Sequence, residues 1–195
     1  IPADPDYLLA VRKLCNDKGI LLIFDEIQCG MGRCGTLFAH ELYNITPDIM
    51  TIAKALGNGF PIGAMLSTKD AATGFDYGSH ATTFGGTPLA TAAALEVVNI
   101  ISKEKFLDRV RQMGQYFKNQ LEKLKEKHTR VVDVRGKGLL LGLELDKNAG
   151  PLVVELFEKG FIVNGIQDKI LRFAPPLIIE EKEIDRLIKG LNSLL

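Results

Sequence analysis

LLIFDEIQ, residues 21–28, is the stretch on which the fold prediction depends. It is a short apolar run that follows Gly19 and ends abruptly in two carboxylates. Such a run predicts a strand buried on both faces, as in a parallel sheet. Because a charge is costly inside such a sheet, we expect Asp25 where the strand emerges, at its carboxyl end. Open α/β sheets bind their ligands at that edge.

Three interpretations of Asp25 compete. It could cap the next helix or pair with a surface arginine. Together with Glu26 it could hold the Mg²⁺ of a P-loop ATPase, since four apolar residues followed by Asp-Glu are also typical of that strand. It could instead pair with a protonated pyridine nitrogen, the partner that a pyridoxal phosphate ring needs. The rest of the chain has to decide between them.

The composition is that of an ordinary globular protein, with 46% hydrophobic and 25% charged residues among 195. Twenty-four basic and twenty-four acidic residues give a formal net charge of zero, which argues against binding to nucleic acid or a membrane surface through bulk charge. No apolar run approaches the ~20 residues of a spanning helix. The three cysteines lack the spacing of a disulfide framework or a metal site, so we expect reduced thiols, a cytoplasmic protein and no bound metal.

The order of elements predicts an α/β fold in two parts. Residues 1–102 alternate helices and strands with glycine-rich loops, whereas residues 103–195 begin with a long amphipathic helix and continue as a smaller α/β unit. The expected strands of that unit include 161–164 and 170–173. We therefore predict a domain boundary between residues 102 and 103.

Lys54 closes a second apolar run, residues 49–54, and is followed by the glycine-rich bend 57–61. Strand alternation would place Lys54 on one face with Met50 and Ile52. A lone lysine is most often solvated, but a glycine-rich bend allows a bulky ligand to approach the backbone closely. Desolvation favours the neutral amine, which a Schiff base with a carbonyl compound requires.

Two further segments contain residues suited to anion binding. Residues 79–88 supply hydroxyls, glycines and a proline just before a predicted helix, a setting suited either to a plain helix cap or to a phosphate. Arg172 lies inside an apolar stretch, either as part of a structural ion pair or as a clamp on a substrate carboxylate. The glycines of GMGRCG, residues 30–35, match a dinucleotide fingerprint, but two carboxylates precede them and would repel a pyrophosphate, so a flexible loop carrying Arg33 is the preferred interpretation.

The order DEIQ at 25–28, Lys54 before GNG, TTFGG at 82–86 and RFAP at 172–175 resembles the class III pyridoxal-phosphate aminotransferases. The resemblance runs the full length of the chain. Within that family, the chain is most similar to the acetylornithine branch. It covers only the later half of such an enzyme, because the family's Ser-Gly-Thr phosphate loop, ring-stacking aromatic residue and second substrate arginine belong to its earlier half. Thr87 is a departure, since the family more often has Asn there.

The resemblance implies a fold and a set of residue roles. Residues 1–102 would be part of the large-domain sheet of a fold type I pyridoxal-phosphate enzyme, followed by a small C-terminal domain. Asp25 would pair with the pyridine nitrogen, with Glu26 beside it in the cofactor site, and Gln28 would hydrogen-bond the phenolic oxygen. Lys54 would hold the cofactor covalently and serve as general base and acid. The remaining implied contacts are Thr83 to the cofactor phosphate across a homodimer interface, Thr82 beside the substrate, and Arg172 to its carboxylate.

The implied function is transfer of an amino group between N-acetylornithine, or a related ω-amino acid, and 2-oxoglutarate, in arginine biosynthesis. Ornithine and 4-aminobutyrate aminotransferases are near alternatives. A P-loop ATPase fragment with Asp25 and Glu26 as magnesium ligands is a distant alternative, because the chain contains no G-x-x-x-x-G-K-[ST]. A dinucleotide-binding oxidoreductase would account for the glycines at 30–35 and little else.

Overall fold

The computed structural model describes residues 1–195 and divides them into two compact units. Ala3–Leu107 forms the N-terminal unit, and Asp108–Leu195 together with Ile1–Pro2 forms the C-terminal unit. The division at 107/108 falls inside a helix, a few residues after the predicted domain boundary. The mixed α/β content of both units confirms the predicted fold class.

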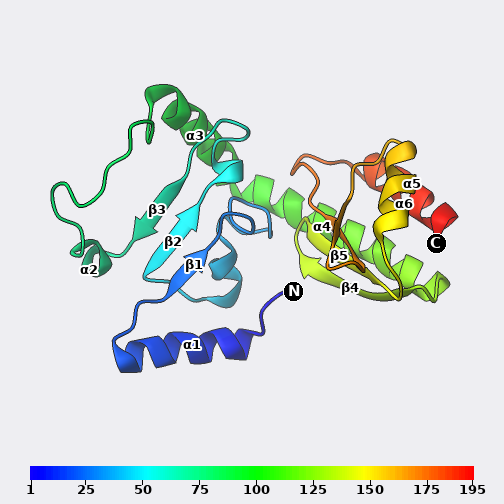
Figure 1. Ribbon diagram of the computed structural model, residues 1–195, viewed down its shortest axis with the longest axis horizontal. Coiled ribbons are helices and arrows are strands. Elements are labelled where there is room, and N and C mark those ends of the chain that lie inside the picture. Colours follow the sequence, from blue (N-terminus) through cyan, green and yellow to red (C-terminus); the bar gives the residue numbers. More distant parts are fainter. The chain divides into compact units, whose positions relative to one another are not determined.

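The N-terminal unit is built around a three-stranded sheet (Figure 1). Strands β1 and β2 pair in parallel, as predicted, and β3 is antiparallel to β2. The central strand β2 is therefore hydrogen-bonded on both sides. The elements in chain order are α1 (Pro5–Lys18), β1 (Ile23–Asp25), η1 (Ala39–Tyr43), β2 (Ile49–Ile52), η2 (Lys54–Leu56), β3 (Ala64–Ser67), α2 (Lys69–Ala72) and α3 (Pro88–Ile101).

Helix α1 has well-defined ends. The Asp4 side chain accepts a hydrogen bond from the Asp6 backbone N–H at 2.8 Å, and Gly19 ends the helix in a left-handed conformation. Cys15 on one face of the helix packs with Leu22 and Ile45 in a small core. These contacts hold α1 against the segment that leads into β1.

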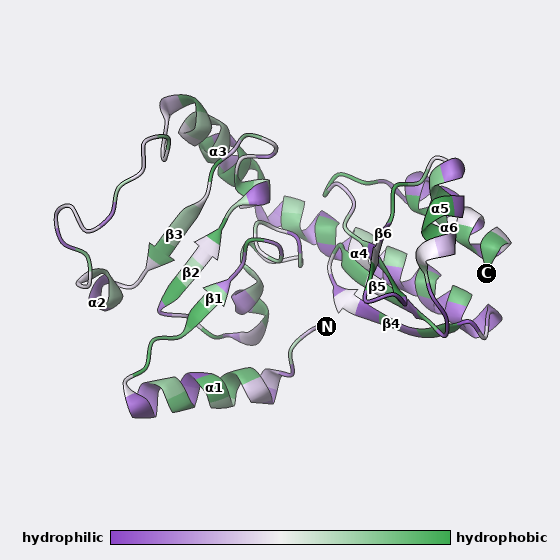
Figure 2. Cartoon of the chain, in the orientation of Figure 1, coloured by the Kyte–Doolittle hydropathy of each residue, from purple (hydrophilic) through white to green (hydrophobic).

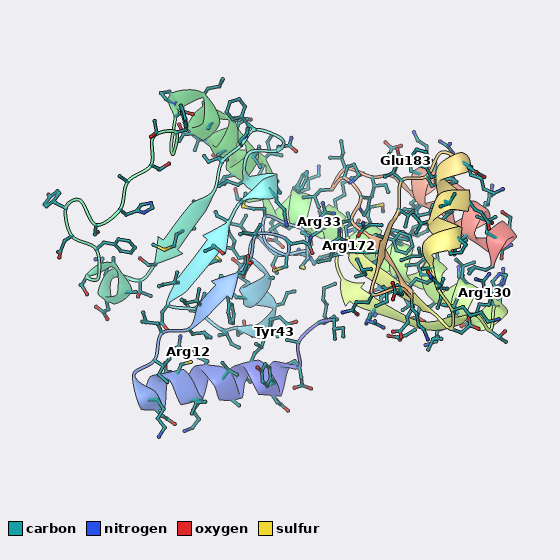
Figure 3. All side chains as sticks on the ribbon, in the orientation of Figure 1. Arg12, Arg33, Tyr43, Arg130, Arg172 and Glu183 are labelled. Atoms are coloured by element: carbon teal, nitrogen blue, oxygen red, sulfur yellow. The ribbon has the colours of Figure 1, made fainter.

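An ion pair joins α1 to the start of β2. Arg12 donates to Asp48 Oδ2 at 2.8 Å, and the same oxygen accepts the Leu22 backbone N–H at 2.7 Å (Figure 3 labels Arg12). These two hydrogen bonds lower the pKa of Asp48, the Leu22 N–H contributing most. The Asp48 carboxylate thereby connects α1, the residue before β1 and the residue before β2, at the end of the sheet opposite Asp25.

Strand β1 is shorter and more exposed than predicted. The side chain of Ile23 is 58% exposed, whereas Met50 and Ile52 on β2 are buried. The prediction of burial on both faces is wrong for β1 in this structure, in which Ile23 and Asp25 are exposed and Phe24 is half-buried. β1 is also an edge strand, paired only with β2. Figure 2 shows that β1, β2 and β3 are nevertheless largely hydrophobic in composition.

The C-terminal unit packs helices on one face of a four-stranded sheet of order β4-β5-β7-β6, with every neighbouring pair antiparallel. Leu141, Leu143 and Leu145 alternate along β5 and are all buried, whereas the residues between them are half-buried. The core therefore lies on one face of the sheet. The elements are α4 (Glu104–Lys127), β4 (Val131–Lys137), β5 (Leu140–Leu145), α5 (Gly150–Glu158), β6 (Asn164–Ile166), β7 (Ile170–Phe173) and α6 (Glu181–Leu194).

Strand β6 lies later in the chain than the predicted strand 161–164. Phe161 instead packs closely on α6, where a Cβ added to Gly190 would lie 2.9 Å from the phenyl ring. The chain pairs with β7 only from Asn164 onward. Strand β6 thus starts three residues later than predicted, because Phe161 makes a tertiary contact with α6.

Arg109 on α4 holds the segment that follows β7. Its guanidinium donates to the carbonyls of Leu177, Ile178 and Ile179 at 2.9, 3.0 and 2.8 Å. Three hydrogen bonds from one side chain fix this connection before α6 begins. No helix of the chain is both long enough and apolar enough to cross a membrane.

Candidate active site

Asp25 and Lys54 lie at the same edge of the N-terminal sheet. Asp25 ends β1 and is the Cα partner of Thr51 in the parallel strand β2, and the next backbone N–H, of Glu26, donates to the Thr51 carbonyl at 3.0 Å. Lys54 follows Thr51 by three residues, just beyond the end of β2. Asp25 and Lys54 therefore lie at, or just beyond, the carboxyl ends of paired parallel strands, the edge at which open α/β sheets bind ligands.

The Asp25 carboxylate is exposed and oriented by two donors. Its Oδ1 accepts the Ile27 backbone N–H at 3.0 Å and the Thr51 hydroxyl at 3.4 Å. Both contacts use one oxygen, which leaves Oδ2 without a hydrogen bond inside the chain. Such a carboxylate is positioned to pair with a cationic nitrogen supplied by a ligand.

Lys54 departs from the predicted strand geometry. It opens the short helix η2 with a φ of +46°, in the left-handed region that side-chain-bearing residues rarely occupy. It does not share a face with Met50 and Ile52, which are buried, whereas Lys54 is exposed. The expected desolvation of its amine is likewise not found within this chain. Strained residues of this kind are often found at functional sites.

The bend after η2 is tight enough to require glycine at position 57. A Cβ on Gly57 would lie 2.1 Å from the Phe60 carbonyl oxygen. The Phe60 backbone N–H in turn donates to the Gly57 carbonyl at 3.0 Å. The bend fixes the direction of the chain immediately after Lys54.

Glu26 points away from this edge, into the unit. Its side chain is 2% exposed and accepts the backbone N–H of Ala39 at 2.5 Å and of His40 at 2.8 Å. His40 Nδ1 lies 2.9 Å from Oε1 and must donate, because a carboxylate only accepts. Both carboxylate oxygens of Glu26 thus accept hydrogen bonds from Ala39 and His40, and these bonds connect the turn after β1 to η1. Gln28 lies in the same turn and is exposed.

The glycine-containing segment 30–35 is packed, contrary to the flexible loop predicted. Met31 and Cys34 are buried, and the backbone N–H of Gly32 donates to the Leu37 carbonyl at 3.1 Å. Burial lowers the pKa of Arg33 and raises that of the Cys29 thiol, which the nearby Glu26 carboxylate raises further. Cys29 therefore remains a protonated thiol rather than a nucleophile.

Thr82 and Thr83 lie in an exposed loop that leads to α3. No hydrogen bond joins either hydroxyl to the rest of the chain. Thr87 caps α3 without a side-chain hydrogen bond, so the first N–H groups of the helix stay open. Phe84 beside them is 83% exposed. The loop thus presents hydroxyls, free N–H groups and an aromatic ring to the outside of the unit.

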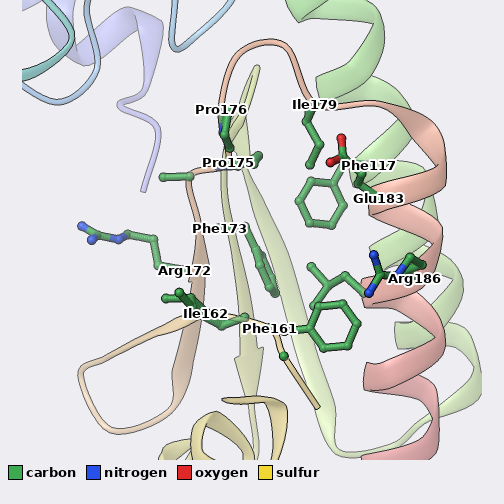
Figure 4. Close-up of a pocket in the computed structure, with 14 residues that line it drawn as sticks. Phe117, Phe161, Ile162, Arg172, Phe173, Pro175, Pro176, Ile179, Glu183 and Arg186 are labelled. Atoms are coloured by element: carbon green, nitrogen blue, oxygen red, sulfur yellow. The ribbon is translucent and has the colours of Figure 1, made fainter. Parts of the chain in front are cut away.

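Arg172 belongs to the C-terminal unit, on β7. It borders a cavity of about 360 Å³ that is lined by Phe117, Phe161 and Phe173. Figure 4 shows the guanidinium of Arg172 extending to the opposite side of β7 from the Phe173 ring. The cavity therefore lies on the aromatic side of the sheet, and the guanidinium of the half-buried Arg172 extends to the other side.

These side chains fit a cofactor with a cationic ring nitrogen and a carbonyl group. The exposed Asp25 oxygen suits the nitrogen, and the exposed amine at the same edge suits the carbonyl carbon. Sequence reasoning missed Thr51, whose hydroxyl orients Asp25. The signal available was a single hydroxyl in an otherwise apolar run, three residues before Lys54.

Comparison with known proteins gives a consistent family assignment. The profile of the family described as "Aminotransferase class-III" matches residues 1–195. Acetylornithine aminotransferase of Methanocaldococcus jannaschii is 52% identical over 192 residues, 98% of this chain and 48% of that protein. The Caldanaerobacter subterraneus protein of the same name is 48% identical, over 99% of this chain and 49% of its own length. The chain thus spans about half the length of these relatives.

Solved structures agree with this assignment. Plasmodium falciparum ornithine δ-aminotransferase superposes with a TM-score of 0.92 at 31% identity, over 99% of this chain and 50% of that one. N-acetylornithine aminotransferase from Stenotrophomonas maltophilia superposes with a TM-score of 0.89 at 35% identity, over 98% of this chain and 51% of that one.

Proposed function

The chain belongs to the class-III aminotransferases, and we propose that it carries the lysine and the ring-nitrogen carboxylate of a pyridoxal-phosphate-dependent aminotransferase. The observation that carries the proposal is the placement of Asp25 and Lys54 at one edge of paired parallel strands. When bound, the cofactor would supply a cationic aromatic ring able to accept the electrons left when a proton leaves the carbon next to an amine.

Each residue of the N-terminal unit has a defined task in this proposal. Asp25 would pair with the ring nitrogen and keep it protonated, while Thr51 and the Ile27 N–H orient the carboxylate. Lys54 would anchor the cofactor and serve as the general base and acid for the substrate proton. Gln28 would hydrogen-bond the phenolic oxygen. Glu26 contributes differently from the sequence prediction, because its buried carboxylate supports the turn rather than the cofactor.

The remaining assignments concern groups outside this edge. Thr83 binds the cofactor phosphate, Thr82 lies beside the substrate, and Arg172 binds a substrate carboxylate. The exposure of the threonine loop and of Phe84 supports a role across the interface of a homodimer. The free cysteines support a reducing, cytoplasmic setting.

N-acetylornithine is the proposed amino donor and 2-oxoglutarate the acceptor, within arginine biosynthesis. Relatives named acetylornithine aminotransferase at 44–52% identity support this choice. Ornithine is the second candidate, because solved ornithine aminotransferases superpose closely. Nothing favours a P-loop ATPase, since the Glu26 carboxylate is enclosed against η1.

Borohydride trapping of the holoenzyme tests the proposal. Reduction after loading with pyridoxal phosphate, followed by peptide mass spectrometry, should place the cofactor on Lys54, and Lys54→Ala should abolish both the adduct and transamination of N-acetylornithine. Lys69→Ala, which removes an exposed lysine of α2, should retain both. An adduct on any other lysine would remove Lys54 from the mechanism. Comparing kcat/KM for N-acetylornithine, ornithine and 4-aminobutyrate decides the donor.

A further inference from the structure

Thr51 contacts the end of β1 through two different oxygens. Its backbone carbonyl accepts the Glu26 N–H at 3.0 Å, and its hydroxyl lies 3.4 Å from Asp25 Oδ1. Because an ionised carboxylate only accepts hydrogen bonds, the hydroxyl is the donor. Thr51 and Asp25 are Cα partners in the parallel pair, so both side chains project from the same face of the sheet. Strand pairing therefore places this hydroxyl beside the carboxylate.

The surroundings of Thr51 direct its hydroxyl to Asp25. Its Cα partner on the other side, in β3, is Met65, whose thioether is a weak acceptor. The buried side chains of β2, Met50 and Ile52, project from the opposite face. Threonine is branched at Cβ, which restricts rotation about χ1, so the donor is held in place before any ligand binds. The carboxylate is the one acceptor of this hydroxyl inside the chain.

The Asp25 side chain is held from two directions. One donor, the Ile27 N–H, belongs to the turn that Asp25 itself begins, so it moves together with the carboxylate. The other donor, the Thr51 hydroxyl, belongs to β2, which leads to Lys54 three residues later. The Thr51 hydroxyl is therefore the side-chain link between the carboxylate and the strand that leads to the lysine. No lysine or arginine of the chain pairs with Asp25, so its charge is available to a ligand.

We infer that Thr51 is a positioning residue whose hydroxyl ties the Asp25 carboxylate to β2 and thereby keeps the ring nitrogen of the bound cofactor protonated. The inference deepens the proposed function and rests on it for the identity of the cofactor. Because the Ile27 N–H remains in any side-chain variant, loss of the hydroxyl should weaken the contact between Asp25 and the ring rather than abolish it.

Binding of pyridoxamine phosphate to the complete enzyme, freed of its cofactor, tests the inference without turnover. This compound has the ring nitrogen but an amine in place of the aldehyde, so it cannot be joined to Lys54. By calorimetry, Thr51→Val, which keeps the branched shape and the strand preference, should weaken binding about three- to tenfold. That is the range for an ordinary hydrogen bond, because 3.4 Å is long for a contact with a charged group.

Two further variants serve as controls for the loss of the hydroxyl. Thr51→Ser, which keeps the hydroxyl, should bind pyridoxamine phosphate within about twofold of wild type. Thr73→Val, the same change at an exposed threonine after α2, should do so as well. Equal weakening by valine and serine at position 51 would overturn the inference, since packing rather than the hydroxyl would then be responsible.

A spectroscopic readout separates positioning from a purely structural role. With pyridoxamine phosphate labelled at the ring nitrogen with nitrogen-15, the bound wild type should give the chemical shift of a protonated pyridine. Thr51→Val should move this signal toward that of the neutral ring, and Thr51→Ser should not. A lower urea midpoint in Thr51→Val with an unchanged nitrogen signal would show a structural role alone and overturn the inference.

The borohydride adduct distinguishes failure of this inference from failure of the proposed function. An adduct on Lys54, with equal pyridoxamine phosphate affinity in wild type and Thr51→Val, would overturn the role of Thr51 and leave the aminotransferase standing. A nitrogen signal that depends on Thr51 in a protein without that adduct would support the role of Thr51 and overturn the proposed function.

Discussion

Replacing Glu26 should separate the structural carboxylate of the DEIQ segment from the functional one. Glu26→Ala leaves the backbone N–H groups of the half-buried residues Ala39 and His40 without acceptors, and removes the partner of the His40 ring. Each unsatisfied buried group costs about 1–3 kcal/mol. The imidazole can turn to water because its side chain is 14% exposed, so the two backbone groups dominate. We expect a loss of about 2–6 kcal/mol, because two backbone groups each lose their acceptor.

The matched control is the adjacent carboxylate. Asp25→Asn changes an exposed side chain and should alter stability by no more than about 0.5 kcal/mol while abolishing cofactor-dependent activity. The stability loss of Glu26→Gln should lie between those of the other two variants, since the glutamine amide nitrogen cannot accept a hydrogen bond from the Ala39 N–H. Urea unfolding followed by far-ultraviolet circular dichroism measures all three, because the chain has no tryptophan to report by fluorescence. Equal urea midpoints for Glu26→Ala and Asp25→Asn would refute the reasoning.

Three other positions give sharp expectations. Gly114→Ala should destabilise the protein by about 1–3 kcal/mol although alanine favours helices, because its Cβ would lie 2.4 Å from the Gly138 carbonyl oxygen. The pKa of Asp48 is lowered in the folded state, so its contribution to stability is present above its unfolded pKa of about 3.9 and is lost as the pH falls through the folded value. Asp48→Asn should therefore flatten the acid limb of a urea midpoint measured against pH. Arg172→Ala should raise the KM for the amino donor about 10- to 100-fold, as loss of a charge-assisted hydrogen bond predicts, with cofactor affinity unchanged.

Each of these expectations has an outcome that would contradict it. A Gly114→Ala protein as stable as wild type would mean that α4 shifts to accommodate the methyl group. An acid limb that persists in Asp48→Asn would assign the pH dependence to other carboxylates. Unchanged kinetics in Arg172→Ala would remove that arginine from substrate binding.

The sequence predicted the parallel pairing of the first two strands and the edge at which Asp25 and Lys54 lie. Both follow from local patterns, namely apolar runs of strand length that end in charge. The sequence analysis placed Glu26 beside Asp25 in the cofactor site, whereas in the structure Glu26 follows β1 and its side chain is buried. Which of them turned inward depended on backbone donors 13 and 14 residues later in the chain, which no local pattern reveals.

Two further features were not predicted. Lys54 has a left-handed backbone just before a bend in which Gly57 and Phe60 approach closely, and strand alternation does not describe a tight bend. The late start of β6 depends on Phe161 and its contact with α6. This second contact joins residues distant in sequence and overrides the intrinsic preference of a short segment.

The backbone at Lys54 has a consequence for laboratory evolution. Glycine or asparagine would adopt a φ of +46° more readily than lysine, at a saving on the order of 1 kcal/mol. A library screened only for thermal stability should therefore select against lysine at position 54 early and yield more stable proteins that have lost catalytic activity. At this position the requirements of the reaction and those of a durable fold are in direct opposition.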